Sequence, residues 1–225
     1  MEQKAEFEMA QAMAELARQA TQRTEQQASA YLCYWLAFTN IYAVLGAQAG
    51  VKPHFGLRKN GTLQTQQVDG IKMAEVFPPT ESALLAKAAE RFPRAAKHRL
   101  IMHESTRFFV QRTPVWQGKS LAMDGYKQRI NGILDMRCTL DPRYPAWSPI
   151  DTRMYTAYTR ASAKGETDDE VLDALVEQVL NALHAVYRNL LYGGAPASDE
   201  NAPAVISQAL ALLANFVEDL LRATK

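Results

Sequence analysis

Apolar residues in the last third of the chain recur at spacings of three and four, which trace one face of a helix. The segment "GETDDEVLDALVEQVLNALHAVYRNLLYGG" carries this pattern until Gly193–Gly194, and a second stretch carries it from the loop "APASDENAP" to the end of the chain. Thr167 followed by Glu170 predicts a capping box at the start of the first helix. Two long amphipathic helices joined by a short loop predict an antiparallel helical pair within an all-α bundle.

The first half of the chain contains two different kinds of helical segment. Residues 26–48 are apolar on most sides, which predicts a central core helix, whereas residues 2–23 are rich in Ala, Glu and Gln with few large apolar residues. We therefore expect a peripheral or partner-facing N-terminal helix in residues 1–25 and a single helical domain in residues 26–225. Further helices are expected at about 80–91, 97–112, 120–136 and 150–163.

Helical periodicity is lost at about residues 50–79. Turn-forming residues punctuate this segment at Pro53, Gly56, Asn60–Gly61 and Pro78–Pro79. The stretch "GLRKNGTLQ" has the composition of a small hairpin turning at Asn60–Gly61. The predicted fold is thus an all-α helical bundle with two long antiparallel C-terminal helices and an irregular insertion at about 50–79 that can hold a hairpin.

Composition narrows the class of protein. The chain has 225 residues, of which 48% are hydrophobic and 22% charged, with a formal net charge of +1. Cys33 and Cys138 are too few for a disulfide framework and suit a reducing compartment. The N-terminus lacks the pattern of a signal peptide, and Thr39 and Asn40 interrupt the longest apolar run, so we expect a buried helix, no membrane span and a cytoplasmic protein.

A local excess of positive charge lies between residues 87 and 119. This segment has eight Lys or Arg residues against two Glu residues, with aromatic residues between them. Such a surface suits RNA, because phosphate contacts supply most non-specific affinity. The candidate RNA-binding residues are Arg91, Arg94, Lys97, Arg99, Arg107 and Arg112. The alternative is a solvated helix face whose charge is balanced by the acidic stretch "ETDDEVLDALVE".

The stretch "HAVYRNLLYGGAP", residues 184–196, places the polar pair Arg188–Asn189 near the end of an apolar helix. An arginine at this position has an ordinary explanation, because the carboxyl end of a helix favours cations and offers carbonyl groups to cap. A functional explanation comes from the sequence features before and after the pair.

A long amphipathic helix, Arg-Asn, a few apolar residues, Gly-Gly, the acidic loop "SDEN" and a final amphipathic helix resemble the end of the HEPN superfamily, in particular its ApeA-like, defence-associated members. The resemblance is sharpest over residues 167–221, and "YLCYWLAFTNIY" is similar to the aromatic first core helix of such proteins. It implies a homodimer whose Arg-bearing helices share one cleft. In ribonuclease members the active site is an arginine followed, four to six residues later, by a histidine. By that resemblance Arg188 takes the place of the arginine and Asn189 that of its usual companion.

The family histidine is missing, because no histidine occurs between Arg188 and Lys225. Metal-independent RNA cleavage needs a base for the 2′-hydroxyl, a task that suits histidine with its ordinary pKa near 6.5. Tyr192 is the nearest replacement, but tyrosine with a pKa of about 10 is a poor base at neutral pH. His184 lies one helical turn before Arg188 and is the other candidate.

No cofactor is expected. His98 and His103 are five residues apart, which is not the spacing that directs two helical ligands at one metal, and no phosphate-binding or dinucleotide-binding glycine motif occurs. The resemblance implies an RNA-binding or partner-binding protein without efficient catalysis, in a toxin–antitoxin or phage-defence setting. Two alternatives stay open: an active metal-independent endoribonuclease using Arg188 with His184 or Tyr192, and a purely structural or interaction protein.

Overall fold

The structure is a computed structural model, which describes residues 2–21, 26–52, 54–55, 65–68, 71–74, 76–77, 81–111, 115–116, 119–120, 128–130, 133–135, 150–191 and 202–223. Side chains are described in residues 4–21, 26–52, 84–110, 150–187, 190 and 203–223.

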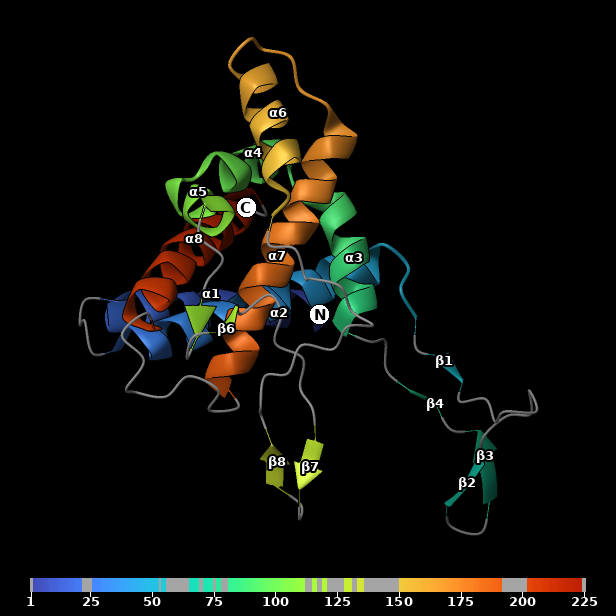
Figure 1. The fold of residues 1–225 in the computed structure, drawn as a ribbon. Coiled ribbons are helices and arrows are strands. Elements are labelled where there is room, and N and C mark those ends of the chain that lie inside the picture. Colours follow the sequence, from blue (N-terminus) through green and yellow to red (C-terminus); the bar gives the residue numbers. More distant parts are fainter. Residues whose placement is uncertain are drawn as a thin grey trace.

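Helices dominate the described residues and confirm the predicted all-α bundle (Figure 1). They are α1 (Glu2–Thr21), α2 (Gln27–Gln48), α3 (Glu81–Arg91), α4 (Arg94–Met102), α5 (Glu104–Gln111), α6 (Thr152–Ser162), α7 (Asp169–Leu191) and α8 (Ala202–Ala223). The long helices α7 and α8 run in opposite directions, as their amphipathic pattern and short connection predict. The α1 and α2 helices lie side by side, and α2 also packs against α3, α7 and α8.

Short antiparallel strand pairs join the helices. Within residues 54–77, β1 (His54–Phe55) pairs with β4 (Val76–Phe77), and β2 (Thr65–Val68) pairs with β3 (Ile71–Ala74). In the second pair the register runs from Thr65 opposite Ala74 to Val68 opposite Ile71. The hairpin expected at Asn60–Gly61 would turn among residues 56–64, which lie outside the described residues. The expectation at Asn60–Gly61 therefore stays a prediction.

The helix expected at about 120–136 is wrong for the part that is described. There β7 (Gln128–Ile130) pairs with β8 (Ile133–Asp135), and upstream β5 (Val115–Trp116) pairs with β6 (Lys119–Ser120). The reason is visible in the sequence: Asn131–Gly132, a dipeptide that favours tight turns, lies between Ile130 and Ile133, and β-branched residues favour strands.

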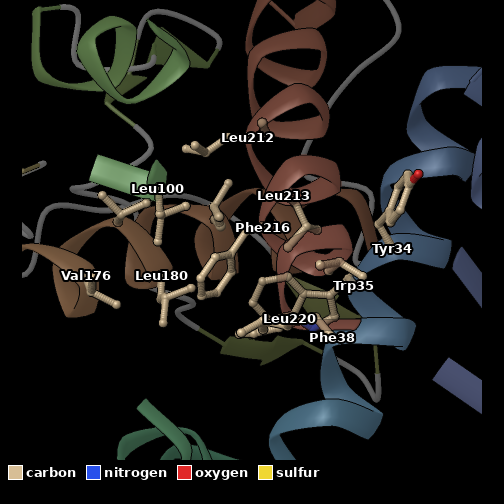
Figure 2. Packing of buried hydrophobic residues seen from close by; sticks show 14 of the residues in the cluster. Tyr34, Trp35, Phe38, Leu100, Val176, Leu180, Leu212, Leu213, Phe216 and Leu220 are labelled. Atoms are coloured by element: carbon tan, nitrogen blue, oxygen red, sulfur yellow. The ribbon is translucent and has the colours of Figure 1, made fainter. Parts of the chain in front are cut away.

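The core is built around α2. Trp35 and Phe38 are almost completely buried, and the ring of Phe38 lies 5.8 Å from that of Phe216 of α8. Leu180 of α7 belongs to the same cluster (Figure 2). Because α2 is apolar on most sides, it can be covered by several helices at once, as its sequence predicts. The wholly buried Tyr31 belongs to the same helix, and burial raises its pKa well above the ordinary value.

A glycine sets how closely α3 approaches α2. A Cβ atom at Gly46 would lie 2.8 Å from the Leu84 carbonyl oxygen and 2.9 Å from its Cδ2 atom. No side chain fits there without moving the main chain of α3. Gly46 is thus a packing residue in the last turn of α2, two residues before the helix ends at Gln48.

The single helix expected at 97–112 is divided into α4 and α5 at His103. This residue has an extended main chain (φ −64°, ψ 140°), and its Nδ1 atom accepts a 3.1 Å hydrogen bond from the Ser105 N–H. The buried Thr106 hydroxyl donates to the Leu100 carbonyl at 2.6 Å and so satisfies an acceptor at the end of α4. His103 acts as the N-cap of α5, a role that sequence patterns rarely assign to histidine.

Helix α7 begins one residue later than the predicted capping box. Asp168 is its N-cap, since the carboxylate accepts hydrogen bonds from the N–H groups of Glu170 (2.9 Å) and Val171 (3.2 Å). The Thr167 hydroxyl instead accepts a hydrogen bond from Arg94. Both Thr and Asp are good N-caps, and the contact with α4 decides which of them is used.

The N-terminal helix is attached to the bundle by small residues. Ala10, Ala14 and Ala17 are fully buried, and Arg18 forms an ion pair with Glu218 of α8 at 2.8 Å. The opposite face leaves Met9 and Leu16 about half exposed, at 49% and 50%. Thus α1 packs on the body through buried alanines together with the partly buried Phe7 and Met13. The expected boundary after residue 25 stays a prediction.

Two helices, Gln27–Gln48 and Pro203–Ala223, are long and apolar enough to cross a membrane by length and composition. In each, 56% of the apolar window is buried inside the bundle, as also occurs in core helices of soluble proteins. These helices are weak evidence for a membrane span, and the expected cytoplasmic location stays a prediction.

Candidate functional site at the carboxyl end of helix α7

Arg188 and Asn189 lie in the final turn of α7, which ends at Leu191. The prediction that a helix carries the pair to its carboxyl end is confirmed for the main chain. The side chains of Arg188 and Asn189 and the whole of Tyr192 lie outside the described residues. The site is therefore defined here by what holds the last turns of α7 in place.

His184, one turn before Arg188, belongs to an aromatic stack. Its ring lies nearly parallel to that of Trp35, with centroids 5.4 Å apart and planes at 7°. Tyr187 stacks on Trp35 at 4.9 Å and lies 6.1 Å from His184. The rings of His184 and Tyr187 therefore both pack on one buried indole, and this packing fixes the orientation of the turn that leads to Arg188.

A hydrogen bond also anchors this turn to α2. The Tyr31 hydroxyl, which is fully buried, donates to the Leu183 carbonyl at 2.6 Å. A carbonyl in a helix has a second lone pair, so the bond adds to the helical ladder without replacing it. Helix α2 thus holds α7 both through the aromatic stack and through this bond, within about one turn of Arg188.

Ion pairs neutralise half of the candidate RNA-binding residues. Arg94 contacts Asp169 at 2.6 Å, Lys97 contacts Asp173 at 2.8 Å, and Arg99 contacts Asp219 at 2.6 Å. The hydrogen bond to Asp219 raises the pKa of Arg99. Asp169 and Asp173 belong to the acidic stretch "ETDDEVLDALVE", which the alternative interpretation expects to balance these positive charges. The structural role of these three side chains is to connect α4 to α7 and α8.

The other three candidates differ from one another. Arg91 donates to the Gln48 carbonyl at 3.2 Å, and the side chain of Arg112 lies outside the described residues. Arg107 is exposed and lines a cavity of about 530 Å³ together with His103 and Tyr155. No ion pair of Arg107 occurs among the described side chains. Arg107 is therefore the basic residue of this group that the described contacts leave most available to an anion.

The remaining histidines with described side chains serve structural roles. The Nδ1 atom of His98 lies 2.9 Å from the Tyr158 hydroxyl. His103 accepts the Ser105 N–H at Nδ1, and its Nε2 atom lies 3.0 Å from the Asn215 amide. Burial lowers the pKa of His103, which keeps its ring neutral and suited to this capping role. Within the described ranges no three His, Cys, Asp or Glu side chains gather as a metal site would need.

Comparison of the chain with protein-family models, with curated proteins and with solved structures returned no match. The likeness to the HEPN superfamily therefore rests on the motif residues and on the helix pair that carries them.

Proposed function

We propose that this protein is a HEPN-like helical protein that binds RNA without cleaving it efficiently, as a homodimer, in a toxin–antitoxin or phage-defence setting. One observation carries the proposal: the Arg188–Asn189 pair stands in the last turn of α7, immediately beyond a turn anchored to α2 by Tyr31 and Trp35. An anchored helix end presents a side chain to a ligand with little loss of entropy, as a binding site requires.

The chemistry of arginine suits phosphate at this position. Its planar guanidinium forms charge-assisted, often bidentate hydrogen bonds with phosphate, each worth about 1.5–3 kcal/mol. The carboxyl end of a helix disfavours an anion by about 0.3–1 kcal/mol. The guanidinium contact is the larger effect, so an RNA phosphate is favoured at Arg188 despite the helix dipole.

The position of His184 supports binding over cleavage. A general base must reach the 2′-hydroxyl of the substrate within hydrogen-bond distance. The ring of His184 is instead packed against Trp35, with centroids 5.4 Å apart, on the side of α7 that faces α2. The endoribonuclease alternative would require this ring to leave its stack, or Tyr192 to lose its proton near neutral pH.

The test is RNA binding and cleavage by the purified protein and an Arg188→Ala variant. Arg160→Ala is a matched control, since Arg160 also lies in the last turn of a helix and is exposed. Fluorescence anisotropy with labelled single-stranded RNA should show binding that weakens about tenfold in Arg188→Ala and less than twofold in Arg160→Ala. A gel assay on the same RNA should show no cleavage by either protein.

Each other result selects a different function. Cleavage by the unmodified protein that is lost in Arg188→Ala would establish the endoribonuclease. Absence of RNA binding by the unmodified protein would favour the structural or interaction protein. Analytical ultracentrifugation tests the dimer separately, and a monomer at micromolar concentration would contradict the shared cleft.

A further inference from the structure

A cavity of about 420 Å³ lies between α3 and α7, outside the arginine site. Leu85, Ala89, Val176 and Leu180 form its apolar part. The lining residues of α7 run from Asp173 to His184, a distance of about 16 Å at 1.5 Å per residue. A cavity of this size and lining resembles small-molecule sites, which are mostly apolar with a few placed polar groups.

The cavity exists because α3 packs closely on α2 and loosely on α7. Gly46 allows the main chain of α3 to approach α2, since even a methyl group there would meet the Leu84 carbonyl oxygen at 2.8 Å. Where α3 and α7 face each other, small residues line the cavity: Ala86 and Ala89 of α3 and Ala174 of α7. Short side chains on both helices leave space that leucines would have filled.

The cavity also has acidic lining residues. Glu90, Asp173 and Glu177 all line the cavity. Glu90 pairs with Lys87 and Asp173 pairs with Lys97, at 2.6 Å and 2.8 Å, whereas no described cation pairs with the exposed Glu177. Among the described residues that line the cavity there is no Lys or Arg. An apolar cavity with one uncompensated carboxylate at its edge favours a ligand that is apolar in its body and positive at one end.

We propose that this cavity binds a small organic cation, an ammonium compound with an elongated aliphatic or aromatic body. The apolar body lies between Ala89 and Ala174 and covers Leu180, and the cationic group lies at Glu177. Amide and imidazole groups of Asn181 and His184 line the end of the cavity nearest the arginine site. An anion is disfavoured, because the described lining residues offer it carboxylates and no basic side chain.

The test uses three probes with the same eight-carbon body and different charge: octyltrimethylammonium, 1-octanol and octanoate, each below its aggregation concentration. Isothermal titration calorimetry and NMR chemical-shift changes measure binding to the full chain. We expect the cation to bind about three- to fivefold more tightly than the alcohol, the effect of one exposed ion pair, and octanoate to bind most weakly.

Two variants and one control locate the site. Ala174→Leu fills the cavity and should weaken both the cation and the alcohol more than tenfold. Glu177→Gln should remove the preference for the cation while leaving the affinity for 1-octanol unchanged. Glu166→Gln changes an exposed carboxylate outside the cavity and should alter neither. Circular dichroism melts show whether each variant is folded.

Octanoate binding as tightly as the cation would overturn the proposal, as would unchanged binding in a folded Ala174→Leu variant. If Ala174→Leu does not fold, the chemical-shift changes decide: perturbation centred on residues 85–90 and 173–184 supports the site, and perturbation elsewhere refutes it. RNA binding through Arg188 is measured independently, so failure of either proposal leaves the other standing.

Discussion

The Tyr31 hydroxyl donates a 2.6 Å hydrogen bond to the Leu183 carbonyl, across 152 positions of sequence. Tyr31 is wholly buried in α2, and Leu183 lies in α7 five residues before Arg188. Together with the ring of Trp35 beneath His184 and Tyr187, this bond determines where the last turns of α7 lie. The position of the candidate site is thus set by α2, a helix near the other end of the chain.

Tyr31→Phe removes only the hydroxyl and tests this anchor. The lost bond should cost about 1 kcal/mol, near the middle of the range for a neutral hydrogen bond, because the Leu183 carbonyl keeps its place in the helical ladder. That corresponds to a fall in Tm of roughly 2–4 °C for a chain of this size. Amides of residues 183–191 should also exchange faster in hydrogen-exchange measurements. Tyr155→Phe is the control, since no hydrogen bond of its hydroxyl is found among the described residues. Equal effects of the two variants would mean that the bond does not hold α7.

Gly46→Ala distinguishes helix propensity from packing. Inside an exposed helix this change should stabilise by about 1 kcal/mol, because alanine loses less entropy than glycine. At Gly46 the new methyl group would lie 2.8 Å from the Leu84 carbonyl oxygen, so α3 must move. We expect a net loss of about 1–3 kcal/mol in urea unfolding, typical of overpacking. Ala47→Gly at the exposed neighbouring position shows the propensity effect alone. A raised urea midpoint in Gly46→Ala would refute the close approach.

Because Lys97 is buried and Asp173 is exposed, we expect substitutions of the two residues to change the free energy of unfolding by unequal amounts. The Lys97 side chain is 8% exposed and the Asp173 side chain 54% exposed, with 2.8 Å between Nζ and Oδ1. Asp173→Asn leaves a largely buried ammonium group without its counter-charge and should cost about 1–3 kcal/mol. Lys97→Met replaces that group by an apolar side chain of similar length and should cost less than 1 kcal/mol or stabilise. Denaturant unfolding of both variants checks the order, and a larger loss in Lys97→Met would reverse the interpretation.

His103 predicts a dependence of stability on pH. Its Nδ1 atom accepts the Ser105 N–H, and burial lowers its pKa below the ordinary 6.5. The unfolded chain therefore binds a proton at higher pH than the folded chain does, so this contribution is fully present above about pH 6.5 and is lost as the pH falls toward the lowered value. His103→Asn retains a capping acceptor but does not titrate. Between pH 7.5 and pH 5 the unmodified protein should lose more stability than this variant. Parallel curves of unfolding free energy against pH would show that His103 is not responsible.

Much of the fold follows from local sequence pattern. The helices at 27–48, 169–191 and 202–223 were predicted within a few residues, because apolar spacing records which face each helix buries. The placement of Arg188–Asn189 in the last turn of a helix followed from the same pattern. Prediction failed where local signals were equivalent or weak, as at His103, where a histidine cap divides α4 from α5, and near Asn131–Gly132, where strands replace a helix.

The sequence by itself thus determined the long helices α2, α7 and α8, the apolar character of α2 and the motif at the end of α7, since each depends on residues close together in the chain. Only the tertiary structure decided which charges meet and which rings stack. Arg94, Lys97 and Arg99 form one basic run in sequence, yet each pairs with an acidic residue 75 to 120 positions away. His184 becomes part of a stack because Trp35 lies beneath it. Such contacts depend on how the helices pack, and the sequence pattern of one helix does not specify which residues of other helices it will contact.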